Sequence, residues 1–183
     1  MITKLDQSGM DHQNLIVRKK LIPVRESIIS QINSSPNGTI FSYDFSSVEG
    51  INGSGVDEII SKVIKHLFEV DDKFLFVENL REDYYEHKFN IDGFLKNRSK
   101  VGIVEKHADG VSFLGDISQT QKELLSYVYE NKKVTARDAA DELDKKITLM
   151  STHLNTLYKK RLIQRVEESL IEGGRQFTYK SLF

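Results

Sequence analysis

The chain has 183 residues, of which 39% are hydrophobic and 29% charged, and its formal net charge at pH 7 is -1. This composition excludes a disordered chain, and the balanced charge excludes a generic polyanion binder. The absence of cysteine excludes disulfides, thiolate metal sites and a cysteine nucleophile. No apolar run approaches the ~20 residues that cross a bilayer, so we expect a soluble, cytoplasmic protein with no membrane partner.

The first part of the chain alternates between helix and strand patterns. Residues 1–14 are polar and predict a flexible tail. Apolar residues spaced for one helix face follow at 25–32, and a Ser-Ser-Pro-Asn-Gly break separates them from the alternating strand pattern of 39–45. A Gly-rich turn then leads into a helical stripe over 56–68 and a buried strand at 74–77.

Three further elements complete this first region. A helix is predicted over 82–95, and the strands 101–104 and 110–114 are expected to pair through a turn at 107–110. Short apolar strands separated by amphipathic helices are typical of an α/β layer. We therefore predict an α/β domain over residues 15–114.

The pattern changes near Gly115, where a second domain over 118–183 is predicted. Its elements are helices in quick succession, followed by two short strands around a Gly-Gly loop. In chain order they are a helix over 118–128 capped by Ser118 and Gln121, a helix over 136–143 capped by Thr135, a helix over 147–160, and strands over 164–166 and 176–179. The third helix has a stripe that is expected to be buried, made of Ile147, Met150, Leu154 and Leu157.

This order of helix, helix-turn-helix and two-stranded hairpin resembles the winged helix-turn-helix of MarR-like and ArsR-like bacterial regulators. The resemblance rests on the run VTARDAADELDKKITLMSTHLNTLYKKRLIQRV, in which a capped helix, a turn and a helix closing on a leucine precede a strand. Arg161 stands where the family usually has glycine, and Lys145 stands where it usually has an apolar residue. The resemblance implies that this domain binds duplex DNA.

The side chains of the same segment suit a DNA reader. Residues 145–183 include eight basic and three acidic residues, a net charge of +5, which leaves -6 on the remainder of the chain. Hydroxyl and amide groups hydrogen-bond base edges, an exposed leucine contacts a thymine methyl, and basic groups contact phosphates. The three acids Glu167, Glu168 and Glu172 oppose this reading, because they would repel phosphate. The candidate DNA-binding residues are Lys146, Thr148, Leu149, Ser151, Thr152, Asn155, Lys159, Lys160, Arg161 and Arg175.

Residues 22–114 resemble the STAS-like fold, in particular the STAS-like domain family of unknown function. The shared positions are Asp44, Phe45, Ser46, Val48, Ile51, Ser54, Asp57 and Glu58. In anti-sigma-factor antagonists of this fold, a partner kinase phosphorylates a serine at the start of this helix. The resemblance therefore makes Ser54 a candidate phosphorylation site, with Asn52 where Asp is usual. The alternative for Ser54 is an ordinary helix N-cap.

Other chemistry has little support in the sequence. The five histidines lack metal-ligand spacing, and His87, which follows Glu82, Asp83 and Glu86, is expected on a solvated helix face. The turn at 50–55 lacks the spacing of a dinucleotide site and the lysine of a P-loop. We therefore expect no enzyme activity, no metal and no cofactor.

Two hypotheses follow from these patterns. The first is a bacterial or phage DNA-binding protein, a transcriptional regulator, whose STAS-like domain senses a signal or docks a protein partner. A homodimer is expected in that case, because two half-sites multiply affinity and specificity. The second is a protein-interaction adaptor of the anti-sigma-factor-antagonist type that does not bind DNA.

Overall fold

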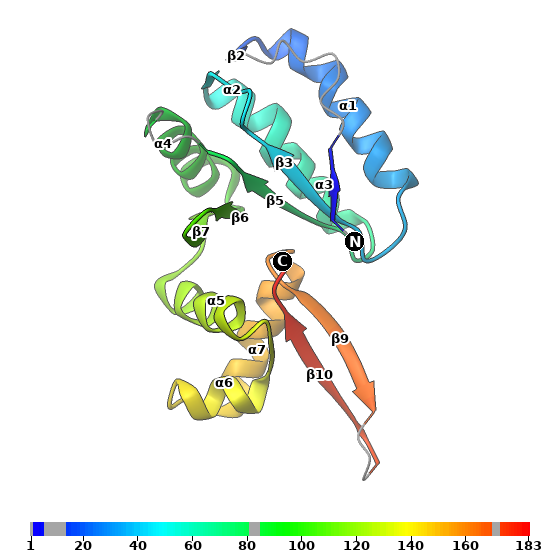
Figure 1. Cartoon of the computed structure of the whole chain (residues 1–183), viewed down its shortest axis with the longest axis vertical. Helices are drawn as coiled ribbons and strands as arrows, with labels where there is room; N and C mark the ends of the chain where they lie inside the picture. Colours follow the sequence, from blue (N-terminus) through cyan, green and yellow to red (C-terminus); the bar gives the residue numbers. More distant parts are fainter. Residues whose placement is uncertain (1, 6–13, 81–84, 170–172) are drawn as a thin grey trace. The chain divides into compact units, whose positions relative to one another are not determined.

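The computed structural model of the chain describes residues 2–5, 14–80, 85–169 and 173–183 (Figure 1). Contacts within the chain divide it into two units, Met1–Ile117 and Ser118–Phe183. Both units combine helices with a sheet, so the chain is a mixed α/β protein.

A five-stranded sheet in the order β1-β3-β5-β6-β7 forms the centre of the first unit. Its first four strands are parallel, and the last is antiparallel to its neighbour. The hairpin between the last two strands closes at the His107–Gly110 pair, which confirms the predicted turn. The strands of this unit are β1 (Ile2–Lys4), β2 (Asn14–Leu15), β3 (Ile40–Asp44), β4 (Gly50–Ile51), β5 (Phe74–Glu78), β6 (Gly102–His107) and β7 (Gly110–Gly115).

The helices of the first unit pack on one face of this sheet. Successive residues of a strand point to opposite faces, and Phe41 and Tyr43 share one core with the apolar sides of the helices. The alternation predicted for residues 39–45 is therefore confirmed. The helices are α1 (Arg18–Ser34), α2 (Gly53–Gly55), the π-helix η1 (Val56–Ser61), α3 (Lys62–Glu69), α4 (Tyr85–Phe94) and the π-helix η2 (Leu95–Ser99).

Two features of the first unit differ from the sequence expectation. Residues 2–4, expected in a flexible tail, form strand β1, which pairs in parallel with Ile40–Ser42. The helical stripe over 56–68 folds as a π-helix followed by an α-helix rather than as one α-helix. Residues 6–13 of the predicted tail and 82–84 of the predicted helix lie outside the described residues.

A close backbone approach fixes the start of η1. A Cβ atom at Gly55 would lie 2.0 Å from the carbonyl oxygen of Leu15, so only glycine fits there. Leu15 belongs to β2, which pairs with β4 just before this turn. The short β2–β4 pair thus holds the Gly-rich turn against the N-terminal end of η1.

The second unit contains three helices and a three-stranded antiparallel sheet in the order β8-β10-β9. Both predicted N-caps are confirmed: Ser118 forms a capping box with Gln121, and Thr135 caps the second helix. Asp138 completes a second capping box with Thr135, which was not predicted. Its elements are α5 (Gln119–Asn131), β8 (Lys133–Thr135), α6 (Ala136–Glu142), α7 (Ile147–Lys159), β9 (Gln164–Ser169) and β10 (Arg175–Lys180).

The core of the second unit lies between its helices and the base of its hairpin. Fully buried residues come from the three helices α5, α6 and α7 and from the residue just before β9: Leu124, Leu125, Val128, Ala139, Met150, Leu154, Leu157 and Ile163. Ile147 was expected in the buried stripe of α7, but it is 44% exposed, because it stands in the first turn of the helix beside an open groove. Strand β8 was not predicted, since its three residues carry too short a pattern.

Candidate nucleic-acid interface

Helix α7 has one buried face and one exposed polar face. Met150, Leu154 and Leu157 are fully buried. The burial of this 3.6-residue stripe places the positions between them on the outside of the unit. The predicted readers Lys146, Thr148, Leu149, Ser151 and Thr152 are all exposed, with Lys146 at the N-cap position. The N-cap and first two turns of α7 therefore present hydroxyl groups, the apolar side chains of Ile147 and Leu149, and one cation together.

Two of the candidate base readers on α7 already have hydrogen-bond partners. The Thr152 hydroxyl donates to the carbonyl of Thr148 at 2.9 Å, which leaves its lone pairs free to accept. The half-buried Asn155 accepts a hydrogen bond from Arg165 on its amide oxygen at 2.9 Å. Asn155 therefore keeps its NH₂ group and one lone pair of its amide oxygen for a base edge.

Three predicted phosphate contacts stand at the C-terminal end of α7. Lys159 is exposed, and the Lys160 ammonium donates to the Gln121 side chain at 3.3 Å. Arg161 follows the helix with a φ of 60° and lies 5.5 Å from the ring centroid of Tyr158. This left-handed conformation explains why glycine is usual there in the family that the segment resembles. Lys145, the other departure, is exposed, so its charge remains in solvent.

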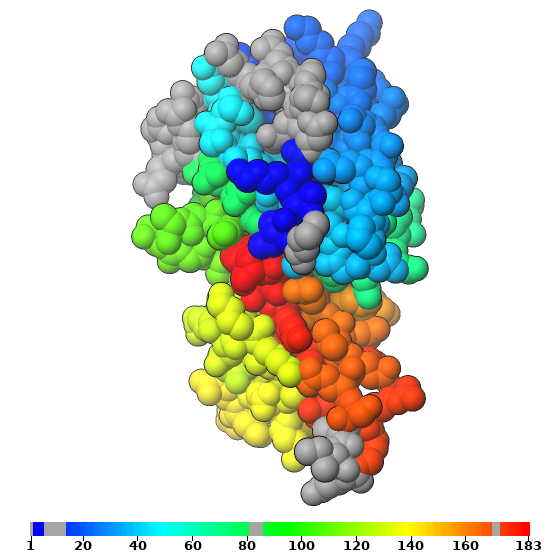
Figure 2. All heavy atoms as spheres, turned by 45° about the vertical axis from the view of Figure 1, so that its right-hand side comes forward, coloured from blue at the N-terminus to red at the C-terminus, as the bar shows by residue number. Residues whose placement is uncertain are grey.

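The hairpin of β9 and β10 carries acids that are paired within the unit. Arg175 has 73% of its side chain exposed and pairs with Glu167 at 3.3 Å. Lys133 pairs with Glu168 at 2.8 Å, and this contact holds the pKa of Glu168 below its ordinary value. Both described acids of the hairpin are thus partly neutralised, while Glu172 lies outside the described residues. The two strands of the hairpin lie at the surface of the second unit (Figures 1 and 2).

A groove between α7 and the hairpin was not predicted. It has a volume of about 190 Å³ and is bordered by the start of α6, the first turns of α7 and strand β10. Two of its walls are large exposed apolar residues, Ile147 and Phe177. Its remaining lining residues are Thr135, Ala136, Arg137, Ser151, Gln176 and Tyr179.

The second candidate region is the Gly-rich turn in the first unit. Asn52, not Ser54, is the helix N-cap, because its side-chain oxygen accepts from the Gly55 amide at 3.1 Å. The N-cap alternative for Ser54 is therefore wrong. Ser54 is the second residue of the short helix α2 and is half-buried.

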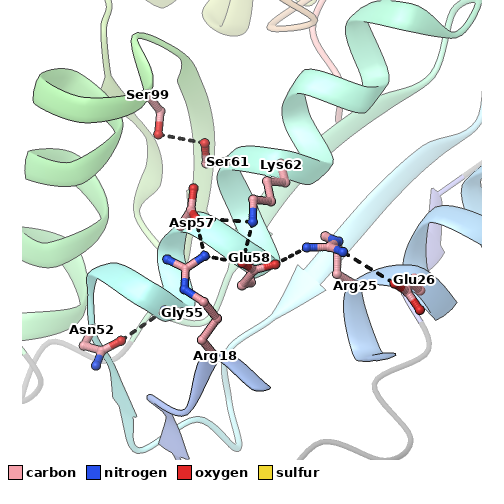
Figure 3. Close-up of polar contacts among 10 residues, drawn as sticks. All are labelled: Arg18, Arg25, Glu26, Asn52, Gly55, Asp57, Glu58, Ser61, Lys62 and Ser99. Atoms are coloured by element: carbon pink, nitrogen blue, oxygen red, sulfur yellow. Dashed lines mark hydrogen bonds and ion pairs between the residues drawn. The ribbon is translucent and has the colours of Figure 1, made fainter. Parts of the chain in front are cut away.

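A buried carboxylate follows this turn. Glu58 is 1% exposed and is bound by Arg18 and Arg25 from α1 and by Lys62 from α3 (Figure 3). Asp57 joins the same cluster through Arg18, at 2.7 Å. Burial raises the pKa of Glu58, but the hydrogen bond and charge of Lys62 and the charges of the two arginines outweigh it and hold that pKa below its ordinary value. The cluster ties α1 to the start of η1.

The structure describes two of the residues that were considered for catalysis, Glu86 and His87. His87 is 1% exposed and packs edge-on to the ring of Phe45, so the expectation of a solvated face is wrong for this residue. Glu86 is exposed, whereas Glu82 and Asp83 lie outside the described residues. Across the part of the chain that the structure describes, no group of three or more acidic or histidine side chains could hold a metal ion.

A shallow groove on the first unit combines aromatic and polar groups. It has a volume of about 400 Å³, and α4, η2 and Gly53 form its walls. Phe89 is 64% exposed at this groove, and Asn97 and Arg98 stand beside it.

None of the helices in the described ranges is both long and apolar enough to cross a lipid bilayer.

Comparisons with known proteins give little further information. No protein-family profile matches the sequence, and no curated protein matches it. Among solved structures, a possible transcriptional regulator from Methanosarcina mazei Go1 is similar to part of the chain, with a TM-score of 0.34 and 15% sequence identity. The similarity covers 36% of this chain and 57% of that chain. A similarity of this extent establishes neither the fold nor the function of this protein.

Proposed function

We propose that the second unit is a winged helix that binds duplex DNA and that the protein is a transcriptional regulator. Helix α7 acts as the recognition helix in the major groove, and the β9–β10 hairpin acts as the wing. The observation that supports this most directly is the exposed face of α7, where Thr148, Ser151 and Thr152 lie beside the cation of Lys146. The protein acts by binding and not by catalysis.

The contacts divide into base readers and phosphate anchors. Thr148, Leu149, Ser151, Thr152 and the NH₂ group of Asn155 read base edges. Lys146, Lys159, Lys160, Arg161 and Arg175 contact the backbone, which sets the register of the helix on the duplex. Neither Lys146 nor Lys159 has an ion pair with another described residue, so both ammonium groups are available to phosphates.

The first unit has a STAS-like role in this proposal. It senses a signal or docks a protein partner, and Ser54 is its candidate phosphorylation site. The groove beside Phe89 favours partner docking, since a 64% exposed phenylalanine next to Arg98 is the kind of anchor that protein interfaces use. The same groove supports the second candidate function, a protein-interaction adaptor without DNA binding. Two copies of the chain would bind the two half-sites of an operator.

A salt titration of DNA binding tests the proposal. A fluorescent duplex of random sequence is titrated with the whole chain between about 50 and 200 mM salt, and the slope of log affinity against log salt counts the phosphates contacted. Lys146→Ala and Lys159→Ala should each reduce that slope by about 0.9. Lys65→Ala, an exposed lysine of α3 in the first unit, is the control and should leave the slope unchanged. Selection of bound duplexes from a random pool then gives the preferred sequence.

The adaptor alternative makes the opposite prediction. A chain that binds no random duplex at about 50 mM salt, with its melting curve intact, excludes the DNA-binding function. Substituting Phe89 by serine should in that case remove binding of a protein partner, whereas the lysine variants of α7 should not.

A further inference from the structure

One arginine connects the end of α7 to both strands of the hairpin. The guanidinium carbon of Arg165, in β9, lies 4.2 Å from the ring centroid of Tyr158 in α7. It also lies 4.4 Å from the ring centroid of Phe177 in β10. A planar cation in contact with two rings is a cation–π arrangement, here formed across three elements of the second unit.

The same guanidinium also makes a hydrogen bond and contacts a directly opposite tyrosine. One Arg165 nitrogen donates to the Asn155 side chain of α7 at 2.9 Å. Tyr179 of β10 lies directly opposite Arg165 in the ladder; burial raises the pKa of its phenol, and the charge of Arg165 opposes that rise without cancelling it. Arg165 thus contacts two residues of α7 and two of β10.

The strand register explains why these contacts fall on one side of the hairpin. Arg165 is paired with Tyr179, and Glu167 with Phe177, in an antiparallel ladder. Residues directly opposite each other in such a ladder share a face of the sheet, and so do alternate residues along each strand. Arg165, Phe177 and Tyr179 therefore share the face of the hairpin that contacts the C-terminal half of α7.

Two of the four residues that Arg165 contacts also line the groove between α7 and the hairpin. Phe177 and Tyr179 form the hairpin wall of the groove, opposite Ile147 and Ser151 of α7. Arg165 itself is half-buried on the same face of the hairpin and is not a lining residue of the groove. The position of the wall relative to α7 therefore depends on the contacts of Arg165.

From this geometry we infer that Arg165 is a positioning residue, which holds the wing at a fixed distance from the recognition helix. The inference rests on the proposed DNA-binding function. A duplex is contacted by the helix in the major groove and by the wing beside it, so both must be correctly spaced before binding. Arg165 acts through Phe177 and Tyr179 and does not itself contact a phosphate.

Two substitutions separate positioning from charge. Lysine keeps the charge at position 165 but loses the planar group that stacks on two rings, and methionine keeps the length without the charge. The probes are a random-sequence duplex and the duplex selected from a random pool. Arg165→Lys and Arg165→Met should each bind the selected duplex about tenfold more weakly than the native chain. The salt slope should stay unchanged in both, since no phosphate contact is removed.

Other roles of Arg165 give different results. If Arg165 contacts a phosphate, Arg165→Lys keeps native affinity and Arg165→Met lowers the salt slope by about 0.9. If Arg165 serves only stability, both variants unfold earlier but bind with native affinity at a temperature where they are folded. Either result overturns the inference. Lys65→Met is the control, because Lys65 is exposed on α3 of the first unit, and the variant should keep native affinity and the native salt slope.

The experiment also distinguishes failure of the inference from failure of the proposed function. If the native chain binds neither duplex at about 50 mM salt, the DNA-binding function is wrong and the inference falls with it. If the native chain binds and Arg165→Lys binds equally well, only the positioning role is wrong.

Discussion

The buried carboxylate of Glu58 gives a sharp test of how the first unit is held together. The residue is 1% exposed, and its partners are less buried, with 45% of the Arg18 side chain, 18% of the Arg25 side chain and 40% of the Lys62 side chain exposed. Glu58→Gln keeps the shape of the side chain and removes its charge. Three cations that converge on one buried position then lose this anion, and among the described residues they keep only their pairs with the more exposed Asp57 and Glu26.

The expected cost follows from this partial exposure. Breaking a fully buried ion pair costs roughly 3–5 kcal/mol, but cations that can turn toward water recover part of that loss. We therefore expect Glu58→Gln to lower the free energy of unfolding of the first unit by about 2–3 kcal/mol. The control is Glu26→Gln, whose carboxylate is 67% exposed and pairs with Arg25 at 3.6 Å, and it should change the stability by less than about 0.5 kcal/mol.

Hydrogen exchange under increasing urea, read on peptides from β3 and β5, measures this free energy in the first unit of the whole chain.

The pH dependence of stability gives a second measurement of the contribution of Glu58. The pKa of Glu58 is lower in the folded chain than in the unfolded chain, where it is near 4.5. Its contribution is therefore complete above about pH 4.5 and is lost as the pH falls through the folded-state pKa. In that acidic range the free energy of unfolding of the native chain should fall to that of Glu58→Gln. Equal stabilities of the two chains at pH 7 would refute the reasoning.

Three further predictions concern single positions. Gly55→Ala should destabilise the first unit by about 2 kcal/mol or more in thermal unfolding, because the new Cβ would lie 2.0 Å from a carbonyl oxygen. Gly93→Ala is the control: Gly93 has open space around it in α4, so this variant should stabilise the unit by about 0.5–1 kcal/mol. Arg161→Gly relieves a left-handed backbone conformation with a φ of 60°, so it should change the free energy of unfolding by less than about 1 kcal/mol. The same variant should lower the salt slope of DNA binding, because it removes a phosphate contact. A larger loss of stability would show that the side chain has a structural role. Asn52→Ala should lower the free energy of unfolding of the first unit by about 1 kcal/mol, because it removes the helix N-cap, and Ser54→Ala should leave it almost unchanged. Equal phosphate labelling of the native chain and Ser54→Ala in cell extract would exclude Ser54 as a modification site.

Local patterns in the sequence predicted most elements, because the interactions behind them span only a few residues. The capping box of Ser118 and Gln121 and the alternation of Phe41 and Tyr43 are present in the structure. Pairings between distant residues were missed. Strand β1 has three residues, too few for a period-2 pattern, and it exists because β3 offers it a parallel edge.

At the candidate interface, too, the local pattern was predictable and the contacts between distant elements were not. Helical periodicity alone places Thr148, Ser151 and Thr152 opposite the buried stripe of α7. The stack around Arg165 was not predictable, because it depends on a strand register that brings β9 and β10 together at Tyr179. The burial of Glu58 was missed for a related reason: its cations Arg18 and Arg25 lie more than thirty residues away, and no local pattern reports such a pairing.

The most direct test of the central claim is the affinity of the whole chain for a random-sequence duplex, measured from about 50 to 200 mM salt. The account predicts binding at the lowest salt that weakens steeply as salt rises, with a slope that becomes shallower by about 0.9 in Lys159→Ala. Absence of binding at about 50 mM salt, or a slope that is the same in the native chain, Lys146→Ala and Lys159→Ala, would contradict it.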